Sequence, residues 1–174
     1  MDTKKLINIF IVEDNNLFTQ ALKADIETVF KNRPIRIYSF ETGEKCMEKF
    51  KQVMPELVIL DYHLNSKSPD AADGIKILDW IKKENKETNV IILTADDHLD
   101  IALKSFEHGA SDYVVKTETK FKKINYSLMN MFKMMEAKDS AKSAKRMLVA
   151  LSLSIVFVIG GITVIEIFAP SLLQ

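Results

Sequence analysis

The sequence predicts a doubly wound α/β domain built on a parallel sheet, followed by one transmembrane helix. Short apolar runs of strand length alternate with amphipathic stretches of helical spacing through residues 1–120. Acidic, hydroxyl and basic residues directly follow several of these runs. A stretch of 19 uncharged residues, 147–165, lies near the C-terminus. The 174 residues therefore divide into one domain and an appendage.

Five apolar runs are the expected strands. They cover 7–12, 35–40, 57–60, 90–93 and 113–115. Most are continuously apolar rather than alternating, which is typical of strands covered by helices on both faces. Strands that alternate with helices are joined by right-handed crossovers and pair in parallel. We therefore expect a five-stranded parallel sheet.

Apolar residues at helical spacing mark segments between the strands. The helical sets are Leu17, Ala21, Leu22, Ile26, Val29 and Phe30; Ile75, Leu78 and Ile81; and Ile101, Leu103 and Phe106. The third set ends at His108 and Gly109, a typical helix C-terminus.

The last helix of the domain is expected to begin near residues 117–119. A heptad-like stripe follows in 3-4-3-4 spacing, made of Phe121, Ile124, Leu128, Met131 and Met135. Two interpretations of the stripe are open. It either makes core contacts that lead into a linker, or it forms a face that pairs with a second copy of the chain.

Cys46 is the only cysteine, so the chain has no internal disulfide. A domain of roughly 120 residues buries enough apolar surface to fold without a disulfide or a metal. We interpret Cys46 as a small structural side chain of a helix.

The net charge of zero conceals an uneven distribution. Residues 1–120 carry 17 basic and 21 acidic side chains, a net charge of −4, whereas residues 121–146 carry seven basic and two acidic, a net charge of +5. Nucleic-acid binders usually carry their basic residues on the folded domain. The acidic domain therefore argues against a nucleic-acid partner, and we interpret residues 137–146 as a basic helical linker.

The uncharged stretch after the linker predicts a membrane span, assigned to residues 147–168. As a helix, its 19 uncharged residues cover about 28 Å, close to the roughly 30 Å hydrocarbon core of a bilayer. Lys142, Lys145 and Arg146 precede the span, and no Lys or Arg follows it. This asymmetry places the N-terminal domain in the cytoplasm and residues 169–174 outside as a short extracytoplasmic tail.

Polar residues gather at one edge of the expected sheet. Glu13 and Asp14 follow the first strand, Asp61 the third, Thr94 the fourth and Lys116 the fifth. Open α/β sheets bind ligands at this edge, beyond the carboxyl ends of the strands. Three carboxylates at close range repel one another unless a cation binds, and oxygen ligands suit Mg²⁺. A metal, a carboxylate nucleophile and an ammonium partner are the components of a phosphoryl-acceptor site.

Four motifs resemble the receiver domain of two-component response regulators of the chemotaxis-regulator type. They are Ile-Phe-Ile-Val-Glu-Asp at 9–14, Leu-Val-Ile-Leu-Asp at 57–61, Ile-Ile-Leu-Thr-Ala at 91–95 and Gly-Ala-Ser-Asp-Tyr-Val-Val-Lys at 109–116. The resemblance runs from about residue 6 to about residue 135. It implies a receiver domain over residues 1–136 with a flavodoxin-like sheet of order 2-1-3-4-5.

The resemblance also implies a role for each site residue. Asp61 would accept a phosphoryl group, and Lys116 would contact the phosphoryl oxygens. Mg²⁺ would be bound by Glu13, Asp14, Asp61 and the backbone carbonyl of His63.

A second set of residues would act as a switch and set its timing. Thr94 would move toward the phosphate, and Tyr113 would turn inward behind it. This movement would change the surface made by the fourth helix, the fifth strand and the fifth helix. His63, Ala95 and Asp96 would modulate the rate at which phosphate is lost.

The chain departs from the family pattern at two places near the site. Thr117 follows Lys116, where the family usually has a proline after a cis peptide bond. A cis bond without proline costs about 3 kcal/mol, so the resemblance does not fix where the next helix begins. The loop after Asp61 is longer than usual, with residues 65–72 in place of a brief turn before Gly74.

The implied function is a membrane-anchored single-domain response regulator that controls a partner or relays phosphate. Its expected location is the bacterial cytoplasmic (inner) membrane, which it crosses once. Its expected partners are a sensor histidine kinase or phosphotransfer protein, an unidentified membrane effector and a second copy of the chain. We expect no enzymatic activity beyond Mg²⁺-dependent self-phosphorylation and self-dephosphorylation.

The alternative function is a membrane-tethered, receiver-like scaffold that binds partners without phosphorylation. A phosphatase of the haloacid dehalogenase type does not fit, because it uses a second aspartate two residues after the nucleophile as acid and base. This chain has His63 there.

Overall fold

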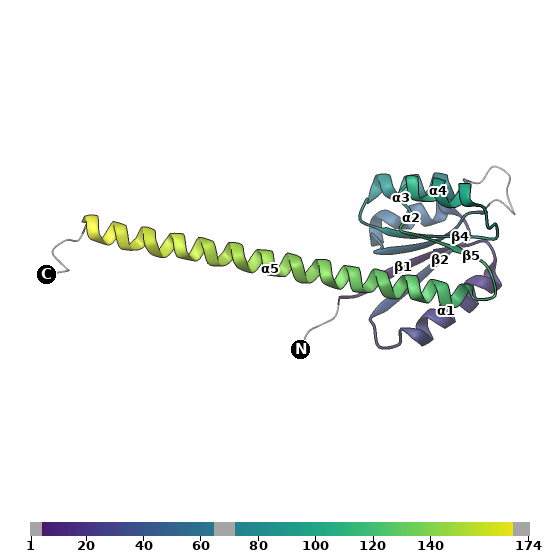
Figure 1. The fold of residues 1–174 in the computed structure, drawn as a ribbon, viewed down its shortest axis with the longest axis horizontal. Helices are drawn as coiled ribbons and strands as arrows, with labels where there is room; N and C mark the ends of the chain where they lie inside the picture. Colours follow the sequence, from purple (N-terminus) through teal and green to yellow (C-terminus); the bar gives the residue numbers. More distant parts are fainter. Residues whose placement is uncertain (1–4, 65–71, 169–174) are drawn as a thin grey trace. The chain divides into compact units, whose positions relative to one another are not determined.

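The computed structural model describes residues 5–64 and 72–168, with side chains up to residue 163 (Figure 1). The chain divides into two compact units, Met1–Met129 and Asn130–Gln174, and each is described by itself. In chain order the elements are β1 (Ile7–Val12), α1 (Asn16–Val29), β2 (Ile35–Phe40), α2 (Gly43–Val53), β3 (Leu57–Asp61), α3 (Gly74–Glu84), β4 (Asn89–Thr94), α4 (Leu99–Glu107), β5 (Asp112–Val115) and α5 (Lys120–Phe168).

The first unit is built on a parallel sheet whose five strands, within the described residues, follow the order β2-β1-β3-β4-β5. Helices cover both faces: α2, α3 and α4 lie on one side, and α1 and the start of α5 lie on the other (Figure 1). The predicted fold class and strand order are therefore confirmed.

The strand boundaries match the predicted apolar runs to within one residue. β1 and β2 begin and end as predicted, whereas β3 extends to Asp61 and β4 extends to Thr94. Asp61 pairs in register with Leu93, and Thr94 pairs with Val115. Two of the candidate site residues are thus held by the backbone ladder of the sheet rather than by a free loop.

The helices follow the predicted sets, with one addition. α4 ends before His108, and Gly109 then adopts a φ of +93°, which suits glycine at a helix C-terminus. α2 was not predicted as a complete helix, although Cys46 was assigned to one. Its buried side contains only Gly43, Cys46 and Phe50, which is too short a pattern to define a helix from sequence.

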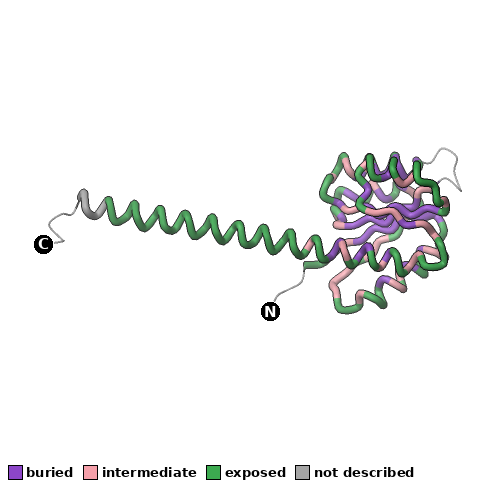
Figure 2. The backbone as a smooth tube through the Cα atoms, viewed as in Figure 1, coloured by how far each residue is buried: buried purple, intermediate pink, exposed green. Residues whose placement is uncertain are grey.

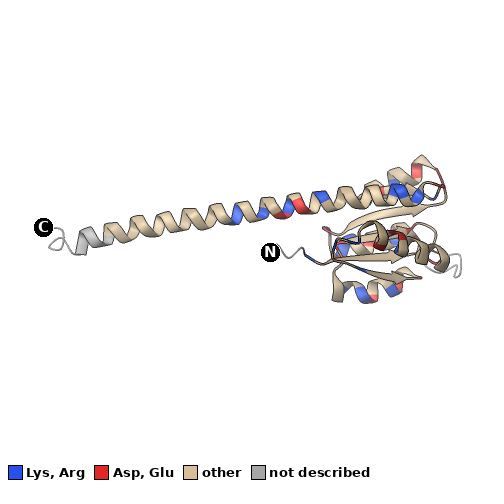
Figure 3. Ribbon diagram, turned by 90° about the horizontal axis from the view of Figure 1, so that it is seen from below, with Lys and Arg blue, Asp and Glu red and all other residues tan. Residues whose placement is uncertain are grey.

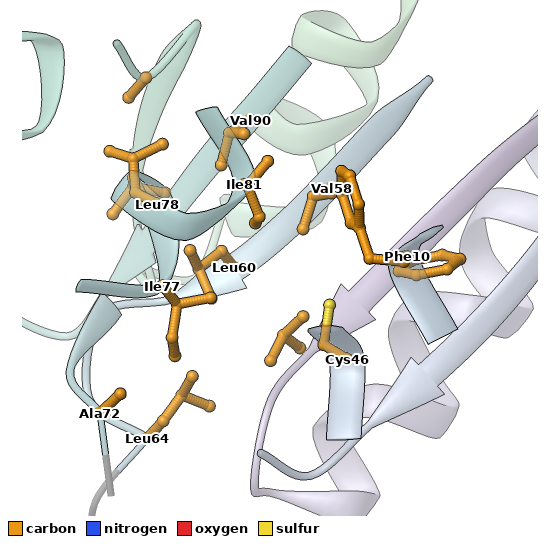
Figure 4. Close-up of a cluster of buried hydrophobic side chains, with 14 residues drawn as sticks. Phe10, Cys46, Val58, Leu60, Leu64, Ala72, Ile77, Leu78, Ile81 and Val90 are labelled. Carbon is orange, nitrogen blue, oxygen red and sulfur yellow. The ribbon is translucent and has the colours of Figure 1, made fainter. Parts of the chain in front are cut away.

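The core lies between the middle strands and the helices that cover them (Figure 2). Every residue of β3 is buried. On one face of the sheet, Cys46 lies among Phe10, Leu60 and Ile77 (Figure 4). Burial raises the pKa of the Cys46 thiol to about 12, so the thiol stays protonated and acts as a small apolar side chain.

The turn from β5 to α5 has Thr117 where the resemblance leads one to expect proline. There is no cis peptide bond among the described residues. The Lys116 N–H donates to the Thr94 carbonyl at 2.7 Å, and the Lys120 N–H donates to the Thr117 carbonyl at 3.1 Å. α5 begins at Lys120, one residue after the predicted region.

The heptad-like stripe on α5 serves the core in its first half. Within the first unit, Ile124 and Leu128 are fully buried. This supports core contact, rather than pairing with a second copy, for that part of the helix.

In the second unit, α5 continues as one helix through residues 137–146 and on to Phe168. Lys and Arg side chains on the helix are followed by a long stretch without charged residues (Figure 3). The helix contains a segment of mean hydropathy 2.0 that is long and apolar enough to cross a membrane, and none of that segment is buried. The predicted tail, 169–174, lies outside the described residues, as do residues 65–71 of the predicted long loop.

Gly74 provides a test of how tightly α3 packs against the end of β3. A Cβ at this position would lie 2.7 Å from the Tyr62 Cα and 2.8 Å from the Asp61 carbonyl oxygen. Because both atoms belong to the backbone, Gly74→Ala is expected to lower the free energy of unfolding by about 1–3 kcal/mol in urea titrations. Lys83→Ala, on the exposed side of the same helix, should stay within about 0.5 kcal/mol of the wild type. Equal stability of the two variants would contradict this packing.

Candidate functional site

The sheet brings the predicted site residues together at the carboxyl ends of four adjacent strands. Glu13 and Asp14 follow β1, Asp61 ends β3, Thr94 ends β4 and Lys116 follows β5. An open pocket of about 560 Å³ is formed there, lined by Glu13, Asp14, Asn15, Asn16, Leu17, Asp61 and Lys116.

Three carboxylates form the acidic part of the pocket. One oxygen from each of Glu13, Asp14 and Asp61 lies within 4.8 Å of the others, and all three residues are buried. Buried carboxylates at this spacing repel one another and favour a bound cation. Their hard oxygen ligands are those that Mg²⁺ binds in proteins.

Lys116 supplies the balancing positive charge. Its Nζ donates to Glu13 Oε2 at 2.6 Å and lies 2.9 Å from Asp61 Oδ2. The other oxygen of Asp61, Oδ1, is buried and has no hydrogen-bond partner within the described part of the chain. An unpartnered buried carboxylate oxygen is costly. The residues present therefore fit a metal ion that would take this oxygen as a ligand.

The charged groups of the pocket shift one another's pKa values. Burial, together with the charge of Asp61, raises the pKa of Glu13 despite its hydrogen bond from Lys116. Burial by itself would lower the pKa of Lys116, but hydrogen bonds and charge interactions with Asp61 and Glu13 raise it overall. Lys116 therefore stays charged, while ionised Glu13 is held at an energetic cost that a divalent cation would relieve.

Thr94 and Tyr113 converge on the backbone of Asp96. The Thr94 hydroxyl is fully buried and accepts the Asp96 N–H at 3.1 Å. The Tyr113 hydroxyl donates to the Asp96 carbonyl at 2.9 Å. Burial raises the pKa of Tyr113, so this hydroxyl stays protonated as a donor. The segment after β4 is thus attached both to the end of β4 and to β5.

His63 and Asp96 are in contact with each other just beyond the ends of β3 and β4. His63 Nε2 lies 2.8 Å from Asp96 Oδ2, and both side chains are exposed by more than 40%. This contact joins the segment after β3 to the segment after β4. Both residues were predicted to influence the loss of phosphate, but their pairing was not predicted. Ala95 is exposed beside them, and the metal-binding role of the His63 carbonyl stays a prediction.

Two further residues of the site were not identified from the sequence. Asn15 caps α1, and its N–H donates to Glu13 Oε1 at 3.2 Å. The Phe18 ring centroid lies 5.0 Å from Lys116 Nζ. An asparagine just before a helical set is a recognisable cap signal, whereas nothing in the sequence connects Phe18 with Lys116.

The chain belongs to the response regulator receiver domain family. Residues 9–125, more than half of the chain, match the model of that family. Receiver domains accept a phosphoryl group on an aspartate and bind Mg²⁺ at an acidic pocket, and this chain has an acidic pocket at the corresponding edge of its sheet.

Relatives with curated names are longer proteins. The chain is 30% identical over 113 residues to "Probable C4-dicarboxylate response regulator DctR" of Bacillus subtilis (strain 168), across 65% of this chain and 47% of that protein. It is 27% identical over 110 residues to "Cell cycle transcriptional regulator CtrA" of Caulobacter vibrioides, across 63% of this chain and 44% of that protein. The chain thus spans less than half the length of these two relatives.

Solved structures share the fold. The response regulator DrrB, a Thermotoga maritima OmpR/PhoB homolog, aligns with a TM-score of 0.63 and 26% identity, across 75% of this chain and 54% of that chain. The BeF3-activated DrrB receiver domain aligns with a TM-score of 0.57 and 28% identity, across 72% of this chain and 99% of that chain.

The raised pKa of Glu13 leads to a prediction about the metal-free protein. Glu13→Gln removes one of the crowded negative charges and leaves the Lys116–Asp61 pair in place. We expect a melting temperature in EDTA higher by about 3–6 °C, equivalent to about 1 kcal/mol, together with weaker binding of Mg²⁺. Thermal denaturation with and without Mg²⁺ measures both effects. A lower melting temperature in EDTA would show that the hydrogen bond to Lys116 outweighs the repulsion.

Proposed function

We propose that the protein is a membrane-anchored response regulator that accepts a phosphoryl group on Asp61 from a histidine kinase or a phosphotransfer protein. The observation that carries the proposal is the position of the Asp61 carboxylate. It is buried beside Glu13 and Asp14, with Oδ2 held 2.9 Å from Lys116 Nζ and Oδ1 lacking a hydrogen-bond partner within the described residues. This arrangement suits a carboxylate that binds a cation through Oδ1 and acts as a nucleophile through its other oxygen, next to a charged hydrogen-bond donor.

Glu13, Asp14, Asp61 and the backbone carbonyl of His63 would hold Mg²⁺. When bound, the ion supplies positive charge that neutralises the transferring phosphoryl group. On the acidic side of the pocket, the Asn15 N–H holds Glu13 Oε1 in place.

In the transfer, an Asp61 oxygen attacks the phosphorus of a phosphohistidine. The new O–P bond forms as the P–N bond breaks, and the imidazole leaves with the electron pair of that bond and takes up a proton. Lys116 donates hydrogen bonds to the phosphoryl oxygens, for which its raised pKa keeps it charged. The chain acts as its own substrate, so we infer no separate enzymatic activity beyond self-phosphorylation and self-dephosphorylation.

Thr94 and Tyr113 would transmit phosphorylation to the α4–β5–α5 surface. Both are bonded to Asp96, between β4 and α4. If the Thr94 hydroxyl turned toward the phosphoryl group, it would release the Asp96 N–H and free Tyr113 to follow. His63, Ala95 and Asp96, which follow the ends of β3 and β4, would set the access of water to the phosphoryl group and hence its lifetime.

The membrane anchor is supported by the composition of α5. Its apolar segment carries exposed side chains such as Phe157, at 84% exposure. Such a surface is unfavourable in water and suits lipid. Lys142, Lys145 and Arg146 before the segment favour a cytoplasmic domain. Tethering would raise the effective concentration near a membrane-bound kinase, an effector or a second copy.

Phosphorylation of the full chain in detergent tests the first part of the proposal. With a small acyl phosphate and Mg²⁺, intact-mass spectrometry should show one added phosphoryl group, and the addition should require Mg²⁺. Asp61→Asn should abolish it, because the amide is not a nucleophile of comparable strength. Asp100→Asn, a change of the same type on the exposed side of α4, should be phosphorylated like the wild type. A folded, Mg²⁺-binding chain that stays unmodified would favour the scaffold alternative.

Membrane fractionation tests the anchor. The full chain should stay with membranes through high-salt and alkaline washes and be released by detergent. Replacing Val156 and Ile159 with Asp places two charges near the centre of the apolar segment, at about 2.5–3.5 kcal/mol each, and should move the chain to the soluble fraction. Replacing both with Leu should leave it in the membrane. Soluble wild-type chain would refute the anchor.

A further inference from the structure

An aromatic and cationic cluster adjoins the pocket on the side of α1 and α5. The ring centroids of Phe18 and Phe121 lie 5.6 Å apart at an interplanar angle of 44°. Lys116 Nζ lies 5.0 Å from the Phe18 centroid, and Lys120 Nζ lies 6.0 Å from Phe18 and 5.5 Å from Phe121. We refer to Phe18, Lys116, Lys120 and Phe121 as the aromatic clamp.

The backbone of Phe18 is tied to the acidic pocket. The Phe18 N–H donates to Asn15 Oδ1 at 3.1 Å, and the Asn15 N–H donates to Glu13 Oε1 at 3.2 Å. One asparagine thus fixes both a carboxylate of the pocket and the aromatic residue next to Lys116. The Phe18 ring is half-buried, which shields its contact with the ammonium group from water.

An aromatic ring can hold the Lys116 ammonium group in position without occupying its hydrogen-bond donors. The ring face attracts the ammonium electrostatically, but it accepts no strong hydrogen bond. The N–H donors of Lys116 therefore stay available for oxygens, which in this structure are those of Glu13 and Asp61. A polar residue in place of Phe18 would compete for these donors.

The same cluster bridges the turn at which the chain departs from its family. Thr117 lacks the ring that restricts proline, so no proline constrains the turn from Lys116 to α5. Lys116 and Lys120 flank the turn, and both lie against the Phe18 ring. Phe121 adds the first turn of α5 to this contact.

We propose that Phe18 is a positioning residue for Lys116, and that Lys120 and Phe121 join that position to the first turn of α5. The proposal rests on the proposed function, in which Lys116 contacts the phosphoryl oxygens. These contacts make the start of α5 sensitive to the position of the Lys116 ammonium group, by a route separate from Thr94 and Tyr113.

Phosphorylation kinetics of the full chain in detergent, with a small acyl phosphate and saturating Mg²⁺, test the positioning role. Phe18→Leu keeps an apolar side chain but removes the ring face, and the maximal rate should fall about two- to fivefold, as expected for loss of a partly exposed cation–π contact. The Mg²⁺ dissociation constant should not change. Phe18→Tyr should restore the rate, and Val29→Ala, at an exposed apolar position of the same helix, should match the wild type.

A double-mutant cycle separates positioning from a general structural effect. If Phe18 acts through Lys116, Phe18→Leu should cause no further loss of rate in a Lys116→Met chain. Independent, multiplicative losses would overturn the proposal, as would a Phe18→Leu chain that keeps the wild-type rate.

An NMR measurement reports on the contact without phosphorylation. The ε-CH₂ resonance of Lys116, assigned with Lys116→Met, should carry a ring-current shift that disappears in Phe18→Leu. An unchanged resonance would overturn the clamp even in a protein that is phosphorylated normally. A different outcome is also informative. If Phe18→Leu removes the shift but the wild-type chain takes up no phosphoryl group, the contact exists, and the proposed function and the role of the clamp in transfer are both refuted.

Discussion

The site depends on the ammonium group of Lys116, which is held between two buried carboxylates. β1 and β3 are neighbours, so the residues at their carboxyl ends, Glu13 and Asp61, are forced together. Their side chains are 1% and 5% exposed, which leaves little water to screen their repulsion. Lys116, brought in after β5, contacts both and reduces that repulsion. The remaining negative charge and the unpartnered Asp61 oxygen make the pocket suited to a cation and a phosphoryl group.

Side-chain contacts connect the residues at the strand ends with the segment before α4 and with the start of α5. Thr94 and Tyr113 share the Asp96 backbone as a partner, which connects the buried Thr94 hydroxyl to β5. Lys116 and Phe121 both contact Phe18, which connects the ammonium group to the start of α5. The site is thereby linked to the helix whose later residues form the basic and apolar segments of the chain.

The elements that show a local pattern of apolar residues were predicted from the sequence, whereas contacts between distant side chains were not. Apolar runs marked all five strands of the described sheet, and the signal is clearest in β3, where burial of every residue leaves little choice of residue type. α2 has too few buried residues to show a clear helical period. The contact between His63 and Asp96 was not predicted, since two exposed side chains in separate loops carry no pattern that relates them.

The sequence by itself determined the order of strands and helices, the set of polar residues at the strand ends and the uncharged stretch of α5, because each is encoded by neighbouring residues. Only the tertiary structure decided which of these polar groups touch. Glu13 and Lys116 are 103 positions apart, and His63 and Asp96 are 33 apart. Their contacts follow from which strands are neighbours in the sheet and from how the side chains are oriented. No local sequence pattern encodes either of these. The position of Phe18 against Lys116 is set in the same way.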